Sequence, residues 1–242
     1  MSPTTLVLLP GLDGTEIFFA PLLRHLPSWV HPIVVRYPTS GANGYDELLP
    51  MVMEQVASLP RFAILGWSFG GPLALMVATR RPADVSAVVL CSSFVTTPRP
   101  GLVPFRFAMR APLIAAVRAL RRTRFLIPGY ASSELRRAKA MTWRRVNSRV
   151  LAARSRAALG VDARPQLREC RARLMYLAST RDEVVARAKL SEVLAVAPRT
   201  QVAEVDGPHL ALFTNPAQSA TRIADFLGEK DLGDVAAPGR NA

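Results

Sequence analysis

The sequence has little of several residue types, and each shortage excludes a class of site. Only two cysteines, Cys91 and Cys170, occur among its 242 residues, and their spacing fits neither a disulfide framework nor a metal site. There is no Gly-rich phosphate-binding loop and no cluster of metal-ligating residues. Only three histidines are present, so a catalytic base has few candidates. We expect no metal ion and no other cofactor.

Long apolar runs are also missing. No segment approaches the roughly 18 apolar residues that a membrane-spanning helix needs. The N-terminus lacks the basic start and apolar stretch of an export signal. We therefore expect a cytoplasmic protein. Half of the residues are hydrophobic, which is enough for a chain of this length to bury a sizeable core.

The most informative segment is 62–71, which reads Phe-Ala-Ile-Leu-Gly-Trp-Ser-Phe-Gly-Gly. An apolar run suits a buried strand, and the residues after it favour a helix. A serine between strand and helix, within Gly-x-Ser-x-Gly, sits on a strained turn that exposes its hydroxyl. The glycines at 66 and 70 let the two elements approach closely. Ser68 is therefore the candidate nucleophile.

A serine hydroxyl needs a base to take its proton. His25 and His31 lie in helix-like and strand-like stretches, where they read as surface or packing residues. His209 differs, because it follows the strand-like segment 199–205 within Asp-Gly-Pro-His. The carboxyl ends of parallel strands are where α/β sheets place their chemistry. We expect His209 to be the base.

An acid must orient the imidazole and stabilise its charged form. Asp182 follows the strand-like segment 173–178 and precedes a helical pattern at 188–197. The chain order serine, acid, histidine is the one expected where the nucleophile lies on such a turn between strand and helix. Asp182 is therefore the predicted acid. The neighbouring Glu183 can take the same role, and either residue can instead be a helix-start charge.

Two backbone N–H groups are needed for the developing oxyanion. One is expected from Phe69, directly after the nucleophile. The other is expected from Leu12, in the Gly-rich turn after the first predicted strand, 4–9. The side chains of Trp67 and Phe69 flank the nucleophile. They either line an acyl-binding site or pack in the core.

These motifs resemble those of the α/β-hydrolase superfamily over roughly residues 4–95 and 172–228. The matching residues are Pro10-Gly11-Leu12-Asp13-Gly14, Gly66 to Gly71, Asp182 after its strand, and Gly207-Pro208-His209 with Pro216 downstream. The first loop departs from the usual His-Gly. Within the superfamily, the elbow and the cap charge look like the carboxylesterases that cleave pimeloyl-carrier-protein methyl ester in biotin synthesis.

The resemblance and the alternating patterns imply an α/β-hydrolase fold with about six mostly parallel strands. Strands are predicted at 4–9, 31–37, 61–66, 86–91, 173–178 and 199–205, with helices at 18–26, 44–57, 69–80, 188–197 and 216–227. Residues 1–97 and 172–228 would form the core, and 229–242 a loose tail. The segment 98–171 would be an inserted cap, with helices at about 105–122 and 133–159.

Charge separates this cap from the core. Of 31 basic and 18 acidic residues, 19 basic but only 3 acidic ones lie between 98 and 173, a net charge of +16 against −3 elsewhere. Focused positive charge attracts anionic partners. Arg145, Arg149 and Arg156 cluster on one predicted helix face and suit an acidic acyl carrier protein. An anionic membrane surface is the alternative, since 104–124 interleaves apolar residues with arginines. Alternatively, these arginines form a solvated surface that binds no partner.

Nucleic acid is a poor candidate, because no stacking platform or binding motif accompanies the charge.

The expected reaction is hydrolysis of a carboxylic ester through an acyl-enzyme, with a small acyl ester or a carrier-bound ester as substrate. Thioester cleavage, acyl transfer, or an esterase that docks on lipid would use the same residues.

Overall fold

The computed structural model describes residues 3–124 and 132–229, although the side chains of 121–124 are not described. Its centre is a six-stranded parallel sheet in the order β2-β1-β3-β4-β5-β6. The strands are β1 (Thr4–Leu9), β2 (Val30–Val34), β3 (Phe62–Trp67), β4 (Val85–Cys91), β5 (Arg173–Arg181) and β6 (Gln201–Pro208). The predicted number and parallel direction of the strands are confirmed, with ends that differ by up to three residues.

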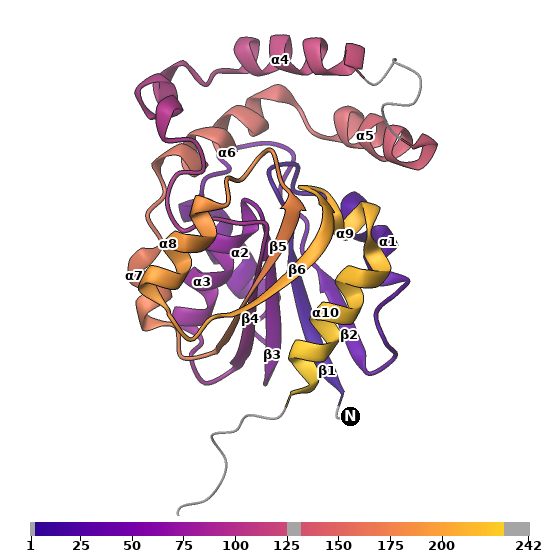
Figure 1. The fold of residues 1–242 in the computed structure, drawn as a ribbon. Coiled ribbons are helices and arrows are strands. Elements are labelled where there is room, and N and C mark those ends of the chain that lie inside the picture. The colour runs from indigo at the N-terminus through magenta and orange to yellow at the C-terminus, as the bar shows by residue number, and fades with distance from the viewer. Residues whose placement is uncertain (1–2, 125–131, 230–242) are drawn as a thin grey trace, which may run out of the picture.

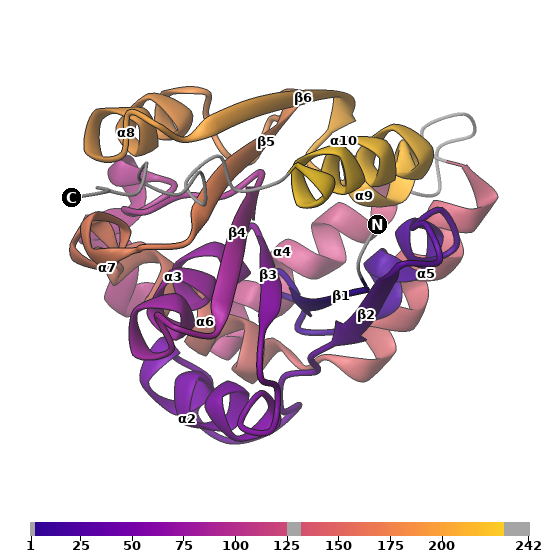
Figure 2. The same cartoon turned by 90° about the horizontal axis from the view of Figure 1, so that it is seen from below.

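Helices cover both faces of this sheet (Figures 1 and 2). One face carries α2 (Tyr45–Gln55), α3 (Gly70–Arg80), α7 (Arg164–Glu169) and α8 (Ala188–Val196). The other carries the 3-10 helix η1 (Ile17–Phe19), α1 (Ala20–Leu23), α9 (Ala211–Thr214) and α10 (Pro216–Gly228). A parallel sheet needs such covers because its crossover connections run over both faces.

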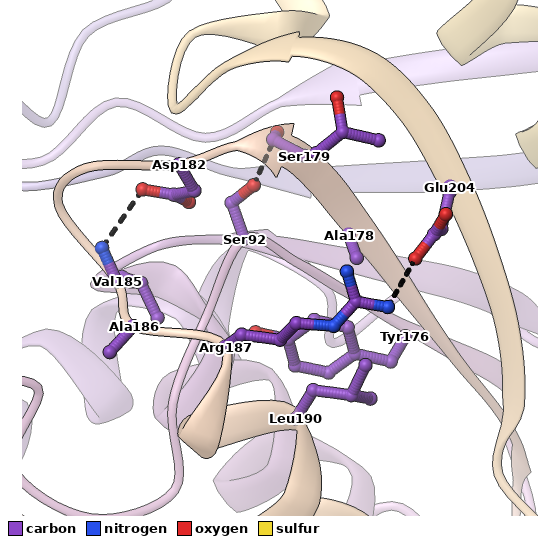
Figure 3. A pocket seen from close by; sticks show the side chains of 11 residues that line it. Ser92, Tyr176, Ala178, Ser179, Asp182, Val185, Ala186, Arg187, Leu190 and Glu204 are labelled. Atoms are coloured by element: carbon purple, nitrogen blue, oxygen red, sulfur yellow. Dashed lines mark hydrogen bonds and ion pairs between the residues drawn. The ribbon is translucent and has the colours of Figure 1, made fainter.

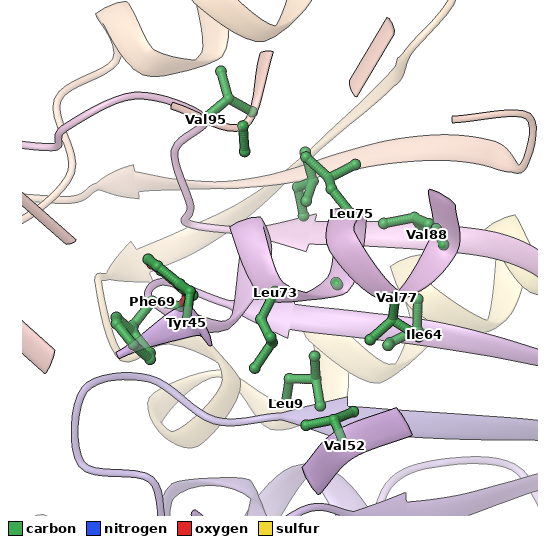
Figure 4. Close-up of a cluster of buried hydrophobic side chains, with 14 of the residues drawn as sticks. Leu9, Tyr45, Val52, Ile64, Phe69, Leu73, Leu75, Val77, Val88 and Val95 are labelled. Atoms are coloured by element: carbon green, nitrogen blue, oxygen red, sulfur yellow. Dashed lines mark hydrogen bonds between the residues drawn. The ribbon is translucent and has the colours of Figure 1, made fainter. Parts of the chain in front are cut away.

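Successive side chains along each strand point to opposite faces of the sheet and pack into two separate cores. On β1, Val7 and Leu9 pack with α2 and α3, whereas Leu6 and Leu8 pack toward α1 and α10. Figure 4 shows the first core, where Val52 of α2 meets Leu9. All four β1 side chains are fully buried. Burial on both faces fixes the strand register, since a slip of one residue would exchange the two faces.

The segment between β4 and β5 forms a helical cap above the carboxyl ends of the strands (Figure 1). Its elements are η2 (Pro100–Ala108), α4 (Ala111–Arg124), α5 (Ser133–Arg145) and α6 (Ser148–Gly160). The helix α4 is the outermost layer and packs on α6. The cap thus contains more, shorter helices than the two predicted.

Both predicted cap helices are broken for local reasons. A helix over 105–122 would place the Pro112 ring against the carbonyl of Ala108, and η2 ends at Ala108. The helix predicted over 133–159 is interrupted at Val146, which is extended, and Asn147 then accepts a hydrogen bond from Val150 N at 2.9 Å. An asparagine in that geometry is an N-cap, and it starts a new helix.

Other sequence expectations have simpler outcomes. Within the described residues, no helix is long and apolar enough to cross a bilayer. Cys91 and Cys170 are free thiols. Most of the predicted tail, residues 230–242, lies outside the described part of the chain.

Candidate active site

Ser68 occupies the turn between β3 and α3. Its φ is +53°, a conformation that L-residues rarely adopt and that stores strain. A Cβ on Gly66 would collide with the backbone of Gly70 and Gly71, and one on Gly70 would collide with the Leu9 carbonyl. The glycine spacing in the sequence therefore reflects a close crossing of strand, helix and neighbouring loop.

The structure brings Ser68, His209 and Asp182 together although they lie far apart in the chain. His209 Nε2 lies 3.0 Å from Ser68 Oγ, and His209 Nδ1 lies 2.8 Å from Asp182 Oδ2. Ser68 is 6% exposed, and the side chains of His209 and Asp182 are 14% and 8% exposed. Both imidazole nitrogens thus have a partner in a largely dry site.

Asp182 is held as a carboxylate by its surroundings. Its Oδ1 accepts the N–H groups of Val184 and Val185 at 2.8 and 2.9 Å. Burial alone raises the pKa of Asp182, but the bonds from His209 and from these N–H groups outweigh it, so the pKa lies below its usual value. Glu183 is exposed and makes no hydrogen bond to His209, so Asp182 is the one of the two carboxylates that contacts the imidazole.

Two further histidines and the indole next to the nucleophile have other environments. The His25 ring contacts the Pro21 carbonyl, and His31 is exposed on β2. Trp67 is 5% exposed in the core beneath the site, and its indole N–H donates to the His209 carbonyl at 3.1 Å. Trp67 therefore supports the loop that carries His209, and its ring lies 5.6 Å from the His209 ring.

The two predicted oxyanion donors follow the neighbouring strands β1 and β3. Phe69 directly follows Ser68 at the start of α3, and Leu12 lies in the loop after β1. Neither backbone N–H has a hydrogen-bond acceptor among the described residues. The Phe69 side chain is fully buried and stacks on Tyr45 with ring centroids 4.5 Å apart. Its contribution to the site is therefore its backbone.

A small cavity of about 60 Å³ lies beside Asp182 (Figure 3). Its wall includes Ser92, whose Oγ lies 2.7 Å from Ser179 Oγ, and Tyr176, which donates to the Ser93 carbonyl at 2.6 Å. Neither Ser68 nor His209 lines it. The volume suits a few water molecules rather than an acyl chain. Sequence reasoning missed these residues because no motif marks them.

A comparison with known protein families identifies the family to which this fold belongs. Residues 6–222 match the model of the alpha/beta hydrolase family, which is most of the chain. The protein is an alpha/beta hydrolase. The predicted fold class and superfamily are thereby confirmed.

Individual relatives of this hydrolase differ in chemistry. It is 33% identical over 109 residues to phytyl ester synthase 1, chloroplastic, of Arabidopsis thaliana, a match that covers 41% of this chain but only 16% of that longer protein. It resembles the enol-lactonase of Burkholderia xenovorans LB400 with a TM-score of 0.78 at 18% identity, covering 95% of this chain and 93% of the other. The bromoperoxidase of Bacillus anthracis gives 0.78 at 14% identity, covering 94% and 93%. Such distant structural matches establish the fold alone.

The three cap arginines of this hydrolase do not share one surface role. Arg145 donates to Glu16 Oε1 at 2.6 Å, and Arg156 donates to the Met109 carbonyl at 2.6 Å. Arg149 lines an open hollow of about 450 Å³ between α4 and α6. Arg145 thus ties the cap to the core, whereas Arg149 faces an open surface. The described residues contain no group of three or more His, Cys, Asp or Glu that could hold a metal.

Proposed function

We propose that this alpha/beta hydrolase is a serine carboxylesterase. The observation that carries the proposal is the chain of contacts from Ser68 through His209 to Asp182, at 3.0 and 2.8 Å. These distances lie within the range for proton transfer between nucleophile and base. Asp182 orients the imidazole and stabilises it once it is protonated.

In the first half-reaction, Ser68 Oγ attacks the ester carbonyl while His209 Nε2 takes its proton. The tetrahedral oxyanion is held by the N–H groups of Leu12 and Phe69, each such donor being worth about 3 kcal/mol of barrier. The carbon–oxygen bond to the alcohol then breaks, and the alcohol leaves with the proton from His209. The product is an acyl group on Ser68.

The second half-reaction repeats these steps with water. His209 removes a proton from water while the water oxygen bonds to the acyl carbon. The bond between that carbon and Ser68 Oγ then breaks, Oγ regains a proton from His209, and the acid is released. No metal ion or redox group enters either step. The burial of the three side chains limits competition from bulk water for their hydrogen bonds.

Replacing the nucleophile tests this assignment. Ser68→Ala should lower kcat on p-nitrophenyl esters by about 10⁶-fold and abolish labelling by a fluorophosphonate. Ser191→Ala, an exposed serine on α8, is the matched control and should change neither. Labelling that persists in Ser68→Ala, or loss of activity in the control, would refute the assignment. Graded acyl chain lengths in the same assay would define the preferred ester.

Acyl transfer to an alcohol is the second candidate, favoured by the similarity to a phytyl ester synthase. An alcohol would replace water in the second half-reaction, with the same roles for Ser68 and His209. Product analysis with and without a long-chain alcohol separates the two: a new ester that forms at the expense of free acid supports transfer. Thioester substrates would use the same first step, and the same assay with acyl-thioesters tests them.

The outer surface of the cap supports a lipid surface as the source of the ester. On α4, Ile114 and Arg118 face inward, and Arg118 donates to the Trp143 carbonyl at 2.6 Å. Apolar side chains instead face solvent. The large exposed ones on η2 and α4 are Leu102, Val103, Phe105, Phe107, Leu113, Val117 and Leu120. Apolar residues on the outside of a basic cap suit an anionic lipid surface.

A carrier-bound acyl ester, such as pimeloyl-carrier-protein methyl ester, is the competing source, which the basic charge of the cap supports. Arg149→Glu is the informative variant, because Arg145 also holds Glu16 and its loss would disturb the cap. A fall in rate on a carrier-bound ester, with the rate on a soluble ester retained, supports the carrier. Sedimentation with anionic vesicles, weakened at high salt, supports the lipid surface.

A further inference from the structure

The helix α6 carries a charged side chain that is fully buried, Arg154. Its guanidinium donates to the Leu12 carbonyl at 2.9 Å and to the Pro38 carbonyl at 2.8 Å. It also donates to Asn43 Oδ1 from Nη2 at 2.6 Å and from Nε at 3.2 Å. One cap residue therefore bonds to two loops of the hydrolase core, the one after β1 and the one after β2.

Its charge is compensated inside the protein. Burial lowers the pKa of Arg154 to about 10, so it stays cationic at neutral pH. Burial raises the pKa of Asp13, while Thr15 and the Arg154 charge oppose this. The guanidinium also lies 5.2 Å from the centre of the Tyr37 ring. A buried cation with this many partners is costly to leave unpaired, so the loops and the arginine hold one another.

The contacts of Arg154 and Tyr37 bracket one peptide group. The N–H of Leu12 belongs to the peptide that joins residues 11 and 12. On one side, the Tyr37 hydroxyl donates to the Pro10 carbonyl at 3.2 Å. On the other, Arg154 holds the Leu12 carbonyl. Between them, the Gly11 carbonyl of that same peptide accepts the Gly14 N–H at 3.0 Å. Because the peptide is planar and trans, the Leu12 N–H points in the opposite direction.

Gly14 shows that this loop is shaped around the guanidinium. Its φ is +69°, and an added Cβ would overlap Arg154 Nη1. A side chain there would therefore both strain the backbone and displace the arginine. The Gly14 carbonyl in turn accepts the Tyr37 N–H at 2.9 Å. Arg154, Tyr37 and Gly14 are therefore in mutual contact.

We propose that Arg154 is a positioning residue for the oxyanion hole, through which the cap holds the Leu12 N–H toward the Ser68 site. The inference rests on the proposed esterase function. Misplacing a catalytic donor by about 1 Å can cost 10²-fold in rate. Because an oxyanion contact forms only in the transition state, its loss lowers kcat and leaves KM unchanged. The cap is then part of the catalytic apparatus as well as a cover over it.

Arg154→Lys tests this, because lysine keeps the charge but not the planar set of donors. We expect kcat on a soluble p-nitrophenyl ester to fall by about 10- to 100-fold with KM within about twofold. The inhibition constant of a trifluoromethyl ketone, which forms an oxyanion on Ser68, should rise by the same factor. Arg168→Lys, an exposed arginine on α7, is the matched control and should change neither.

Tyr37→Phe is a second, milder variant, since it removes only the hydroxyl that holds the Pro10 carbonyl. We expect the same pattern at about three- to tenfold, in line with one lost hydrogen bond. Added methylguanidinium should restore part of kcat in Arg154→Ala. A purely structural residue would lower the melting temperature without this selective loss and rescue.

The outcomes separate the inference from the function on which it rests. If the folded Arg154→Lys and Tyr37→Phe proteins keep wild-type kcat and ketone affinity, the positioning role is wrong while the esterase stands. Equal weakening of substrate and ketone binding would also overturn it. If the wild-type protein neither hydrolyses esters nor labels with a fluorophosphonate, the esterase proposal itself fails.

Discussion

The core and the cap of this hydrolase are built by different rules. In the core, strand side chains alternate between two fully buried clusters, and the segments outside 98–173 carry a net charge of −3. The cap has a net charge of +16 over 98–173. It also leaves large apolar side chains such as Phe107, 74% exposed, in solvent.

This difference indicates that the core and the cap have different roles. The core supplies Ser68, His209 and Asp182 from the ends of three parallel strands, as expected where a sheet positions chemistry. Under the proposed function, the cap presents the surface that meets the substrate or its carrier. Arg154 is the exception, because it belongs to the cap in sequence and to the core in burial. Variants on each side of this division should therefore affect different measurements.

A change in the core should have the largest effect. Asp182→Asn keeps the side-chain volume but cannot stabilise a protonated His209, and we expect kcat to fall by about 10³- to 10⁴-fold. The measurement is steady-state hydrolysis of a soluble ester. Glu183→Gln is the control, because Glu183 is next in sequence but makes no hydrogen bond to His209. Comparable losses in both variants would mean that the acid has been misassigned.

A change on the cap should spare this chemistry and remove docking. Replacing both Phe105 and Phe107, which are 59% and 74% exposed, by serine should lower partition to anionic vesicles by about 10- to 100-fold. Each ring is already partly covered by protein, so its insertion contributes about half of the roughly 1.5–3 kcal/mol of full burial. The rate on a soluble ester should stay within about twofold.

Met141→Ser provides the comparison for that pair, since Met141 is exposed and apolar but lies on α5. It should sediment with vesicles like the wild type. Vesicle binding that survives the loss of both phenylalanines would remove the lipid-docking role from η2, and the basic charge alone would then explain any membrane affinity.

Acid should destabilise the core through Asp182. Burial raises the pKa of Asp182, but the bond from His209 and the backbone N–H donors lower it below its usual value. The ionised form of Asp182 therefore adds stability above the unfolded pKa of about 3.9. That stability is lost as pH falls through the folded pKa. The melting temperature of the wild type should therefore fall more between pH 5 and 3, as approximate limits, than that of Asp182→Asn. Parallel curves would contradict the assigned shift.

The smallest effect is expected at the break within the cap. Asn147→Ala removes the cap of α6 and should cost about 1 kcal/mol, or about 2–4 °C in melting temperature for a chain of this size. Asn147→Asp keeps the oxygen that accepts Val150 N and should recover most of this loss. A full loss in Asn147→Asp would assign the effect to the bond from Asn147 to the Thr39 carbonyl instead.

The sequence carries most of the fold and the position of the site, because periodic apolar runs and the Gly-x-Ser-x-Gly spacing are local signals. The strand patterns and the two glycines around Ser68 correspond to buried strands and a close crossing in the structure. The chain order of the motifs placed Asp182 and His209 at neighbouring strand ends.

What the sequence does not carry depends on contacts between distant residues. Arg154 reads as one of several solvated cap arginines, yet it is buried against loops more than 100 residues away in the chain. The predicted cap helices are longer than the observed ones, because the apolar stripes continue across Pro112 and Asn147, where the structure starts new helices. The bond from the Trp67 indole to the His209 carbonyl joins residues 142 positions apart, and no local pattern in the sequence signals it.

The most direct test of the account is the site of the acyl group during turnover. The protein is mixed with excess p-nitrophenyl ester, quenched in acid within the first turnover, and digested for mass spectrometry. We predict an acyl adduct on the peptide that contains Ser68, and no adduct in Ser68→Ala. An adduct on another residue, or hydrolysis that Ser68→Ala retains at the wild-type rate, would contradict the account.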